Sequence, residues 1–243
     1  MNVRLDALLA RNLGCSKTAA AALLADGRVR DGGGQALTDR RRGIDEATLP
    51  FVVVIDDDPP RALVAQAHVL LNKPLGVVTA LRDPVHRTAY ELLRAAPLHG
   101  ELRPVGRLDL DTTGLLLWTT EGAWVQRLTH PKRQVPRTYQ AALARPHQPL
   151  PAELVLEDGH RPHILALTPL GPTQRHPSLV APPESAAFAS ITVVGGAYHE
   201  VRRIFAALGS HVLGLCRVGF GRLTLPPELP MGSFSVVDIS QAV

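Results

Sequence analysis

The residues of this chain that are best suited to chemistry lie between Arg103 and Gly122. Within that stretch Arg107 precedes Asp109 by two residues, and a second carboxylate, Asp111, follows. An arginine close by can keep a carboxylate ionised in a partly desolvated pocket. An ionised carboxylate can act as a nucleophile on a sugar carbon or as a base toward a proton. Asp109 is therefore the first candidate for a catalytic residue.

The surrounding sequence predicts how this carboxylate is held. The apolar run Leu115–Trp118 predicts a buried strand, and Gly106 and Gly114 bracket a loop just before it. Catalytic side chains often lie on such loops, because a rigid sheet positions them. A lone aspartate in a loop more often binds backbone N–H groups. The acids Asp109 and Asp111 are also compatible with a hydrolase, so the interpretation depends on the rest of the chain.

Composition sets the general class of the protein. A chain of 243 residues, 45% of them hydrophobic, predicts one large or two small domains with a substantial core. The formal net charge is +4, and 26 residues are basic, almost all of them arginine. Arginine suits phosphate binding, although a genome rich in G and C explains the same preference.

Targeting and metal-binding patterns are lacking. Cys15 and Cys216 have no metal-ligand spacing and imply no disulfide framework. The N-terminus does not resemble a signal peptide, and no apolar run approaches the roughly 18 residues of a membrane span. We therefore expect a cytoplasmic protein with free thiols, no membrane segment and no bound metal.

Residues 1–58 are predicted to form a small N-terminal module. Leucines at helical spacing run from Leu5 to Leu13, and Gly14 ends that pattern. Ser16 is a candidate N-cap for a second helix over residues 17–25. The run Phe51–Ile55 predicts a closing strand.

The rest of the chain is divided by punctuating residues. The acidic, proline-containing segment after Ile55 predicts a linker over residues 59–67, so the catalytic domain is expected at residues 68–243. A short helix is expected over residues 124–129, and a second helix is expected to end at Gly209. The proline-rich segment 169–183 predicts a long loop. Four histidines between residues 145 and 187 lack metal-ligand spacing and are predicted to be solvated loop residues, namely His147, His160, His163 and His176.

Several motifs occur together in an order typical of one family. The segment Gly106–Asp109 resembles the GRLD motif of the RsuA branch of the pseudouridine synthases, which isomerise uridine in ribosomal RNA. The segment Leu71–Val78 is similar to that family's LNKPxGxV motif, and Arg137–Tyr139 is similar to its K-x-Y motif. The segments Gly195–Gly209 and Leu215–Arg217 resemble its EGRYHQVKRMFAAxG and L-x-R motifs. The resemblance covers nearly the whole chain except residues 145–187.

This resemblance implies a fold and a set of roles. The fold would be α+β, with a catalytic domain built on a mixed, mostly antiparallel sheet flanked by helices. Asp109 would attack the sugar C1′ or take the 2′-proton, Tyr139 would stack on the uracil, and Arg202 would pair with Asp109. The other implied positions contact or shape the substrate site, namely Arg107 in the space left by the flipped base, Leu215 against the uracil, Lys73 in the adjoining loop, and Arg203 toward RNA. No cofactor is implied.

The N-terminal module resembles the S4 RNA-binding domain, which is a small α/β unit. The matching positions implied to bind RNA are Arg4, Ser16, Lys17 and Arg28. The basic run Arg40–Arg42 is compatible either with phosphate contacts or with a solvated surface.

The chain departs from the family pattern at three positions of interest. Arg137 replaces a lysine, which keeps the charge but changes its geometry. Gly195 replaces a glutamate, and Glu200 replaces a glutamine. Glu200 adds negative charge near the site, so we expect it to alter RNA contacts more than the other two changes.

The same motifs bear on the substrate. Tyr198 and His199 resemble small-subunit enzymes, whereas the sequence from Glu200 to Arg203 resembles large-subunit relatives. We expect a monomer that acts on small-subunit (16S) ribosomal RNA in an assembly intermediate. A large-subunit enzyme and an inactive S4-bearing assembly factor are the alternatives, and the presence of all the implied catalytic residues disfavours the inactive factor.

Overall fold

The computed structural model describes residues 2–243. The chain forms two compact units, of which the first comprises residues 2–67 with 95–102, and the second comprises residues 68–94 with 103–243. None of the helices in the described range has both the length and the apolar character needed to cross a bilayer.

Two helices of the first unit begin and end where local chemistry predicts. Helix α1 (Leu5–Leu13) ends at Gly14, whose φ of 65° is left-handed. Helix α2 (Lys17–Ala25) begins after Ser16, whose hydroxyl accepts the backbone N–H of Ala19 at 3.1 Å. The leucines of α1 face inward and form the core of this unit together with residues of α2 and the strands.

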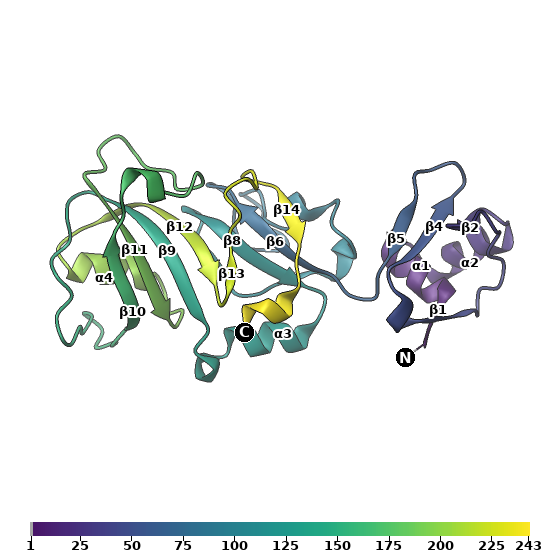
Figure 1. Ribbon diagram of the computed structural model, residues 1–243, viewed down its shortest axis with the longest axis horizontal. Helices are drawn as coiled ribbons and strands as arrows, with labels where there is room; N and C mark the ends of the chain where they lie inside the picture. Colours follow the sequence, from purple (N-terminus) through teal and green to yellow (C-terminus); the bar gives the residue numbers. More distant parts are fainter. Residues whose placement is uncertain (1) are drawn as a thin grey trace. The chain divides into compact units, whose positions relative to one another are not determined.

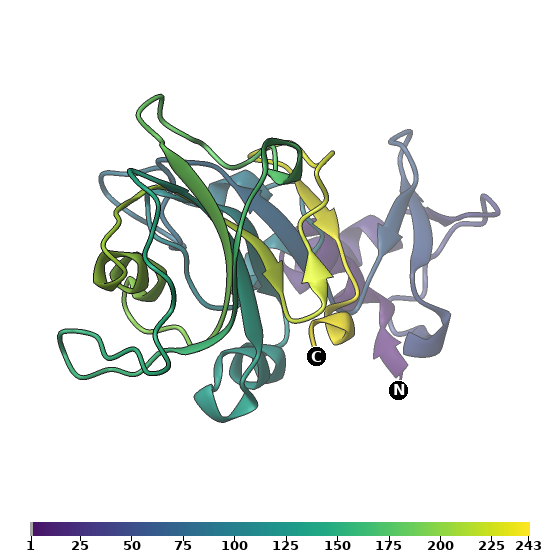
Figure 2. The ribbon, with the colours of Figure 1, turned by 60° about the vertical axis from the view of Figure 1, so that its left-hand side comes forward.

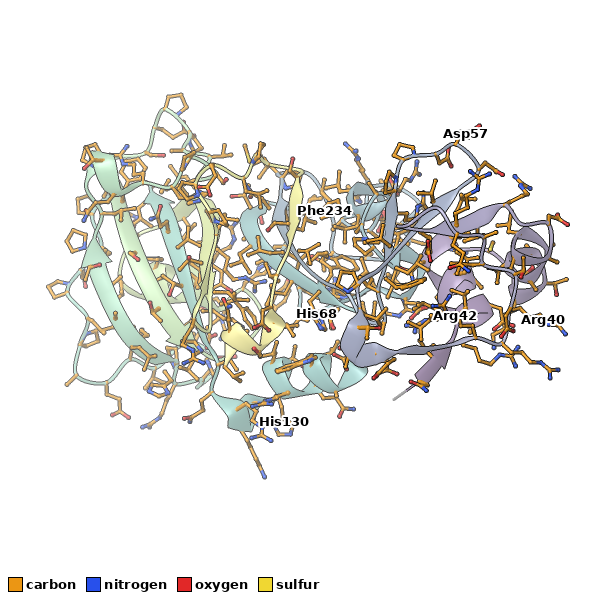
Figure 3. The ribbon with its side chains drawn as sticks, turned by 45° about the vertical axis from the view of Figure 1, so that its right-hand side comes forward. Arg40, Arg42, Asp57, His68, His130 and Phe234 are labelled. Atoms are coloured by element: carbon orange, nitrogen blue, oxygen red, sulfur yellow. The ribbon has the colours of Figure 1, made fainter. Side chains whose placement is uncertain are left out.

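The strands of the first unit form two small antiparallel sheets (Figure 1). Strand β1 (Asn2–Arg4) pairs with β3 (Gly43–Asp45), which leads into the short helix η1 (Glu46–Thr48). Strands β2 (Val29–Asp31), β4 (Phe51–Ile55) and β5 (Arg61–Leu63) form the second sheet. Figure 3 shows Asp57 at the turn between β4 and β5, and Arg40 pointing outward from the loop before β3.

Strand β5 corrects the predicted linker over residues 59–67. Asp56 adopts a left-handed φ of 53°, and the N–H of Asp58 binds the carbonyl of Ile55 at 3.0 Å. This tight turn sends the chain back along β4, and Leu63 is fully buried in the core of the unit. Aspartate tolerates the left-handed conformation, which explains how an acidic segment forms a turn here.

Residues 95–102 belong to the first unit although they are distant in sequence. They include the short helix η3 (His99–Glu101). Nε and NH2 of Arg11 donate to the two carboxylate oxygens of Glu101, each at 2.8 Å. This bidentate pair holds α1 to the segment.

The second unit is built on a nine-stranded mixed sheet. The strand order is β10-β11-β9-β12-β8-β6-β14, with β13 beside β12 and β7 beside β8. Only the pairing of β12 with β8 is parallel, so the prediction of a mixed, mostly antiparallel sheet is confirmed. The strands are β6 (His68–Lys73), β7 (Arg103–Pro104), β8 (Thr112–Thr119), β9 (Pro136–Leu143), β10 (His163–Pro169), β11 (Ala187–Val194), β12 (Val212–Phe220), β13 (Leu223–Thr224) and β14 (Phe234–Val236).

Helices cover this sheet sparsely (Figure 2). Helix α3 (Gly122–Thr129) and helix α4 (Glu200–Ala207) are its two α-helices. The buried face of α4, with Ile204 and Phe205, packs against Ile191 and Leu215 of the sheet. Short 3-10 helices complete the unit, namely η2 (Glu91–Leu93), η4 (Pro131–Arg133), η5 (Pro172–Gln174) and η6 (Ile239–Ala242).

Strand β8 is the central element of the second unit, and every residue of it is buried. It includes the predicted run Leu115–Trp118 and follows directly on the loop that carries Asp109. Gly114 has a φ of +101°, and a Cβ there would lie 2.3 Å from the carbonyl oxygen of Arg217. Only glycine permits this approach, so Gly114 allows β12 to run beside β8.

Candidate active site

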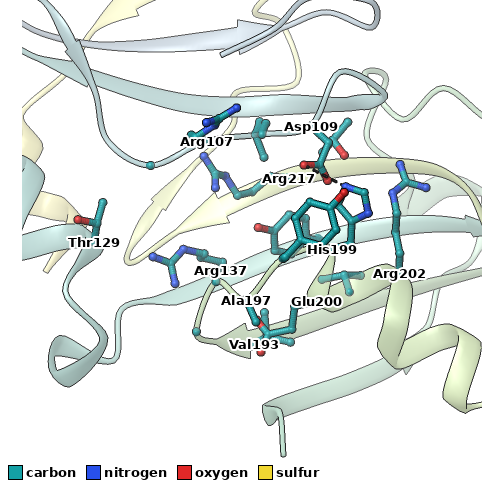
Figure 4. Close-up of a pocket in the computed structure, with 18 of the residues that line it drawn as sticks. Arg107, Asp109, Thr129, Arg137, Val193, Ala197, His199, Glu200, Arg202 and Arg217 are labelled. Atoms are coloured by element: carbon teal, nitrogen blue, oxygen red, sulfur yellow. Dashed lines mark ion pairs between the residues drawn. The ribbon is translucent and has the colours of Figure 1, made fainter. Parts of the chain in front are cut away.

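A cleft of about 860 Å³ opens in the second unit, where the loop after β7 meets β9, β12 and the start of α4 (Figure 4). Its lining brings together five of the residues predicted from sequence, namely Arg107, Asp109, Tyr139, Arg202 and Leu215. Lys73 and Arg203 contribute nothing to this lining.

Hydrogen bonds to its backbone groups hold the loop that carries Asp109. The hydroxyl of Thr79 donates to the carbonyl of Leu108 at 3.0 Å and accepts the N–H of the same residue at 3.1 Å. The N–H of Gly76 binds the carbonyl of Leu110 at 3.0 Å. Thr79 is nearly buried, so these bonds are shielded from water. The residues on both sides of Asp109 are therefore fixed.

Lys73 supports the same region from inside the protein. Its side chain is fully buried, and Nζ donates to the carbonyls of Pro74 at 3.0 Å and Val77 at 2.6 Å. Burial lowers the pKa of Lys73 to about 8, against the opposing influence of Asp111 and Asp109. The ammonium group thus stabilises the loop that leads to Thr79 without reaching the cleft.

The partner of Asp109 is a residue that the sequence did not single out for chemistry. Nε2 of His199 lies 3.6 Å from Oδ1 of Asp109, and both side chains are partly exposed. His199 has a left-handed φ of 49°, and its ring stacks on Tyr198 with 3.8 Å between centroids. The strained backbone and the stacking aim the imidazole at the carboxylate. Its place beside Tyr198 in the motif is the one signal in the sequence that could have identified it.

Arg202 binds a different acid from the one expected. Its NH2 lies 2.9 Å from Oδ2 of Asp111 and 3.2 Å from the carbonyl of the same residue, and NH1 donates to the carbonyl of Val212 at 3.2 Å. The expected pairing of Arg202 with Asp109 is not the one in this structure. Asp111 offers the guanidinium both a carboxylate and a carbonyl, which matches its multiple donors.

Strand register places the remaining side chains on one face of the sheet. Tyr139 of β9 lies opposite Arg217 of β12, and Leu215 lies opposite Ala141 and Thr112. Since alternate residues of a strand share a face, Leu215 and Arg217 point the same way. Arg217 is almost fully buried, and its Nε donates to the carbonyl of Leu115 at 2.8 Å. Arg217 was missed as a site residue, although it belongs to the L-x-R motif.

The lining of the cleft also contains a buried carboxylate, that of Glu200. Oε1 of Glu200 lies 2.9 Å from Nε2 of His160, whereas Oε2 has no hydrogen-bond partner in the described part of the chain. The prediction that His160 is a solvated loop histidine is therefore wrong. A Cβ at Gly195 would lie 3.1 Å from both carboxylate oxygens of Glu200. Gly195 and Glu200, two of the three departures from the family pattern, are thus neighbours, because the carboxylate of Glu200 occupies the space beside Gly195.

The remaining predicted RNA contacts are not among the residues that line the cleft. Arg203 forms an ion pair with Asp158. In the first unit, Arg4 pairs with Asp6 at 2.6 Å and Arg28 pairs with Asp56 at 2.5 Å. Ser16 caps α2, and Lys17 is exposed at its start.

Residues 2–243 contain no cluster of histidine, cysteine and carboxylate side chains that could hold a metal ion. The residues that line the cleft are instead aspartate, histidine, tyrosine and arginine around an apolar wall. Such a set can supply a carboxylate nucleophile or base, proton transfer, and binding of anionic groups.

Comparison with known proteins identifies the class to which this fold and site belong. The model of the RNA pseudouridylate synthase family matches residues 67–207, which include the Asp109 loop, Tyr139 and the whole of α4. The chain belongs to this family and is a pseudouridine synthase, an enzyme that isomerises uridine in RNA.

Particular relatives are similar along nearly the whole chain. Ribosomal small subunit pseudouridine synthase A of Yersinia pestis is 33% identical over 232 residues, covering 96% of this chain and 93% of the relative. The protein of the same name from Escherichia coli K12 is 31% identical over 240 residues, covering 96% and 95%. A crystal structure described as a pseudouridylate synthase matches with a TM-score of 0.58 and 27% identity, covering 99% of this chain and all of that one.

Proposed function

We propose that this enzyme converts one uridine of small-subunit (16S) ribosomal RNA into pseudouridine, in an assembly intermediate where the base is accessible. The observation that carries the proposal is the similarity, across 96% of the chain, to relatives named as small-subunit enzymes. A ribosomal substrate would place the enzyme in the cytoplasm, and a cleft lined within one chain is consistent with action as a monomer.

The proposed chemistry begins at Asp109. In one route the carboxylate bonds to C1′ as the N1–C1′ bond breaks. The released uracil then turns and attacks C1′ through C5, which breaks the bond between C1′ and the carboxylate and frees Asp109. In the other route the carboxylate removes the 2′-proton as the N1–C1′ bond breaks, which gives a glycal. C5 then adds to C1′, and the proton returns from Asp109 to C2′. In both routes C5 finally loses its proton and N1 gains one, so no redox partner is consumed. The partly exposed position of Asp109 on a rigid loop supports either role.

The remaining cleft residues are assigned to the base. The target uridine must leave its stack before Asp109 can reach the sugar. Exposed Arg107, beside Asp109, is placed to fill the space that the base vacates. Tyr139 and Leu215 lie on one wall of the cleft, where a phenol ring and an apolar side chain can contact the faces of the uracil.

The first unit is proposed to be an S4-like RNA-binding domain. Two short helices, small sheets and exposed basic side chains support this assignment. Arg4 and Arg28 each have a carboxylate partner, so RNA phosphates would have to compete with Asp6 and Asp56 for them. The run Arg40–Arg42 has no carboxylate partner among residues 2–243, which makes it the better candidate for phosphate contacts.

Mapping of pseudouridine in ribosomal RNA tests this function. Carbodiimide labelling and primer extension would be compared in cells with the gene, without it, and with an Asp109→Asn copy. We expect one small-subunit signal to vanish without the gene and in the variant, because the amide is neither nucleophile nor base. The Asp109→Asn protein should still bind the RNA. If a large-subunit signal vanished instead, the proposed reaction would stand and the assignment of a small-subunit substrate would be overturned.

A further inference from the structure

One end of the active-site cleft carries positive charge that the protein does not neutralise. Arg107, Arg137 and Arg217 gather at this end, away from His199 and Arg202 (Figure 4). Within residues 2–243, none of these three arginines forms an ion pair with a carboxylate. Each acid of the cleft already has a partner, since Asp109 faces His199 and Glu200 binds His160.

Arg217 is the most costly of these charges. Arg217 is 2% exposed. Within residues 2–243 its side chain makes one hydrogen bond, from Nε to the carbonyl of Leu115 at 2.8 Å. Its NH2 group is buried without any hydrogen-bond partner in the described chain. A buried cation without a counter-ion is strongly unfavourable, so a retained one commonly serves a ligand.

Arg137 lies close to Arg217 and is poorly satisfied as well. Both guanidinium groups lie 5.2 Å from the centre of the Phe220 ring. Within residues 2–243 the guanidinium of Arg137 makes one hydrogen bond, which is long, at 3.5 Å from NH1 to the carbonyl of Val135. Burial, together with repulsion from Arg217, lowers the pKa of Arg137. A negative group between the two would relieve the repulsion and satisfy the free donors.

We propose that Arg137 and Arg217 form a binding site for the phosphodiester group that adjoins the target uridine. The proposal rests on the proposed function, because an RNA substrate supplies such a group on each side of the ribose that faces Asp109. Planar guanidinium groups bind phosphate oxygens through paired hydrogen bonds. The ring of Phe220 supports both groups, and that stacking is one that lysine would not reproduce as well.

The proposal is tested by measuring how the loss of one phosphate charge in the RNA and the loss of one arginine in the protein combine in their effect on Kd. The substrate is a ribosomal RNA fragment that contains the mapped uridine and is converted by the wild-type enzyme. Linkages around the uridine are replaced one at a time with uncharged methylphosphonate, and Kd is measured for wild type and Arg137→Met. We expect neutralisation of one linkage to weaken wild-type binding about tenfold and to have a clearly smaller effect in Arg137→Met, since one of the two arginines that bind it is already missing. The salt dependence of log Kd should also fall by about 0.7 in the variant.

Matched variants separate this site from general charge. Arg161→Met removes an arginine that is 68% exposed and paired with Glu153 outside the cleft, and it should respond to every linkage as wild type does. Arg137→Lys should recover part of the coupling. The proposal is overturned if every linkage weakens wild type and Arg137→Met equally. If the wild-type enzyme converts no uridine in any ribosomal RNA, the proposed function itself fails. If it converts the uridine but no linkage distinguishes wild type from Arg137→Met, only the phosphodiester site fails.

Arg217 provides an independent check. Its substitution risks unfolding, so Arg217→Lys is compared with wild type by tryptophan fluorescence before binding is measured. We expect the folded variant to respond less than wild type to the same linkage that Arg137→Met identifies, because lysine keeps the charge but not the paired hydrogen bonds of arginine. Sensitivity to a different linkage would overturn the assignment of both residues to one phosphodiester.

Discussion

Contacts of the neighbouring residue Leu108 hold the backbone position of Asp109. The hydroxyl of Thr79 binds both backbone groups of Leu108, which immediately precedes Asp109. Thr79→Val keeps the shape of the side chain but removes both bonds. We expect kcat to fall about ten- to a hundredfold with little change in KM, because a small displacement of a reacting group is costly. Thr79→Ser should retain most of the activity, and equal loss in both variants would contradict this role.

Lys73 should make stability depend on pH in a defined direction. Burial lowers its pKa to about 8 from the ordinary 10.5, so between these values the unfolded chain holds more protons than the folded one. The free energy of unfolding contributed by Lys73 therefore rises with pH across this window and is constant below it. We expect the difference between wild type and Lys73→Met to rise between pH 7.5 and 9.5 in urea titrations.

Tryptophan fluorescence is a suitable signal for that measurement, because Trp118 and Trp124 are the only tryptophans and both lie in the second unit. Burial also raises the pKa of Cys216 to about 11. That thiol is present in both proteins, so its contribution cancels in the difference. A difference that stays flat with pH would show that Lys73 keeps its proton.

At the scale of elements, the parallel pairing of β8 with β12 assembles the site. It brings Leu215 and Arg217 beside the strand that follows Asp109. Gly114→Ala would place a Cβ 2.3 Å from the carbonyl of Arg217, at a φ of +101°. We expect it to lower the free energy of unfolding of the second unit by about 3 kcal/mol or more, as steric overlap and backbone strain add.

Gly122 offers a matched control for that substitution. It begins α3, and a Cβ there would meet no atom within 4 Å. Gly122→Ala should leave the urea midpoint unchanged or raise it slightly, because alanine favours a helix. Equal losses in Gly114→Ala and Gly122→Ala would contradict the explanation from close strand approach.

At the scale of the whole molecule, binding and chemistry are assigned to different units of one chain. A tethered RNA-binding unit raises the effective concentration of the catalytic unit near its target. Replacement of Arg40, Arg41 and Arg42 with glutamine should weaken RNA binding and reduce the salt dependence, while kcat at saturating RNA stays near wild type. The measurement is Kd at several salt concentrations together with single-turnover rates. An unchanged salt slope would remove these arginines from the RNA interface.

Local chemistry was enough to predict much of this protein. Gly14 and Ser16 mark helix boundaries because their backbone and side-chain preferences act within one turn. The run Phe51–Ile55 is a strand as predicted, and Leu115–Trp118 lies within β8. The order of motifs along the chain also indicated the family, because each motif is a short segment whose residue types can be read directly.

Tertiary structure decided what depends on residues far apart in the chain. The partners of Arg202 and Glu200, the imidazole beside Asp109, and the uncompensated Arg217 follow from packing that no short segment encodes. The same holds for residues 95–102, which join the first unit, and for β5, which extends its sheet. The physical reason is that strand pairing and ion pairing between distant segments depend on which faces become buried together, and burial is a property of the folded chain.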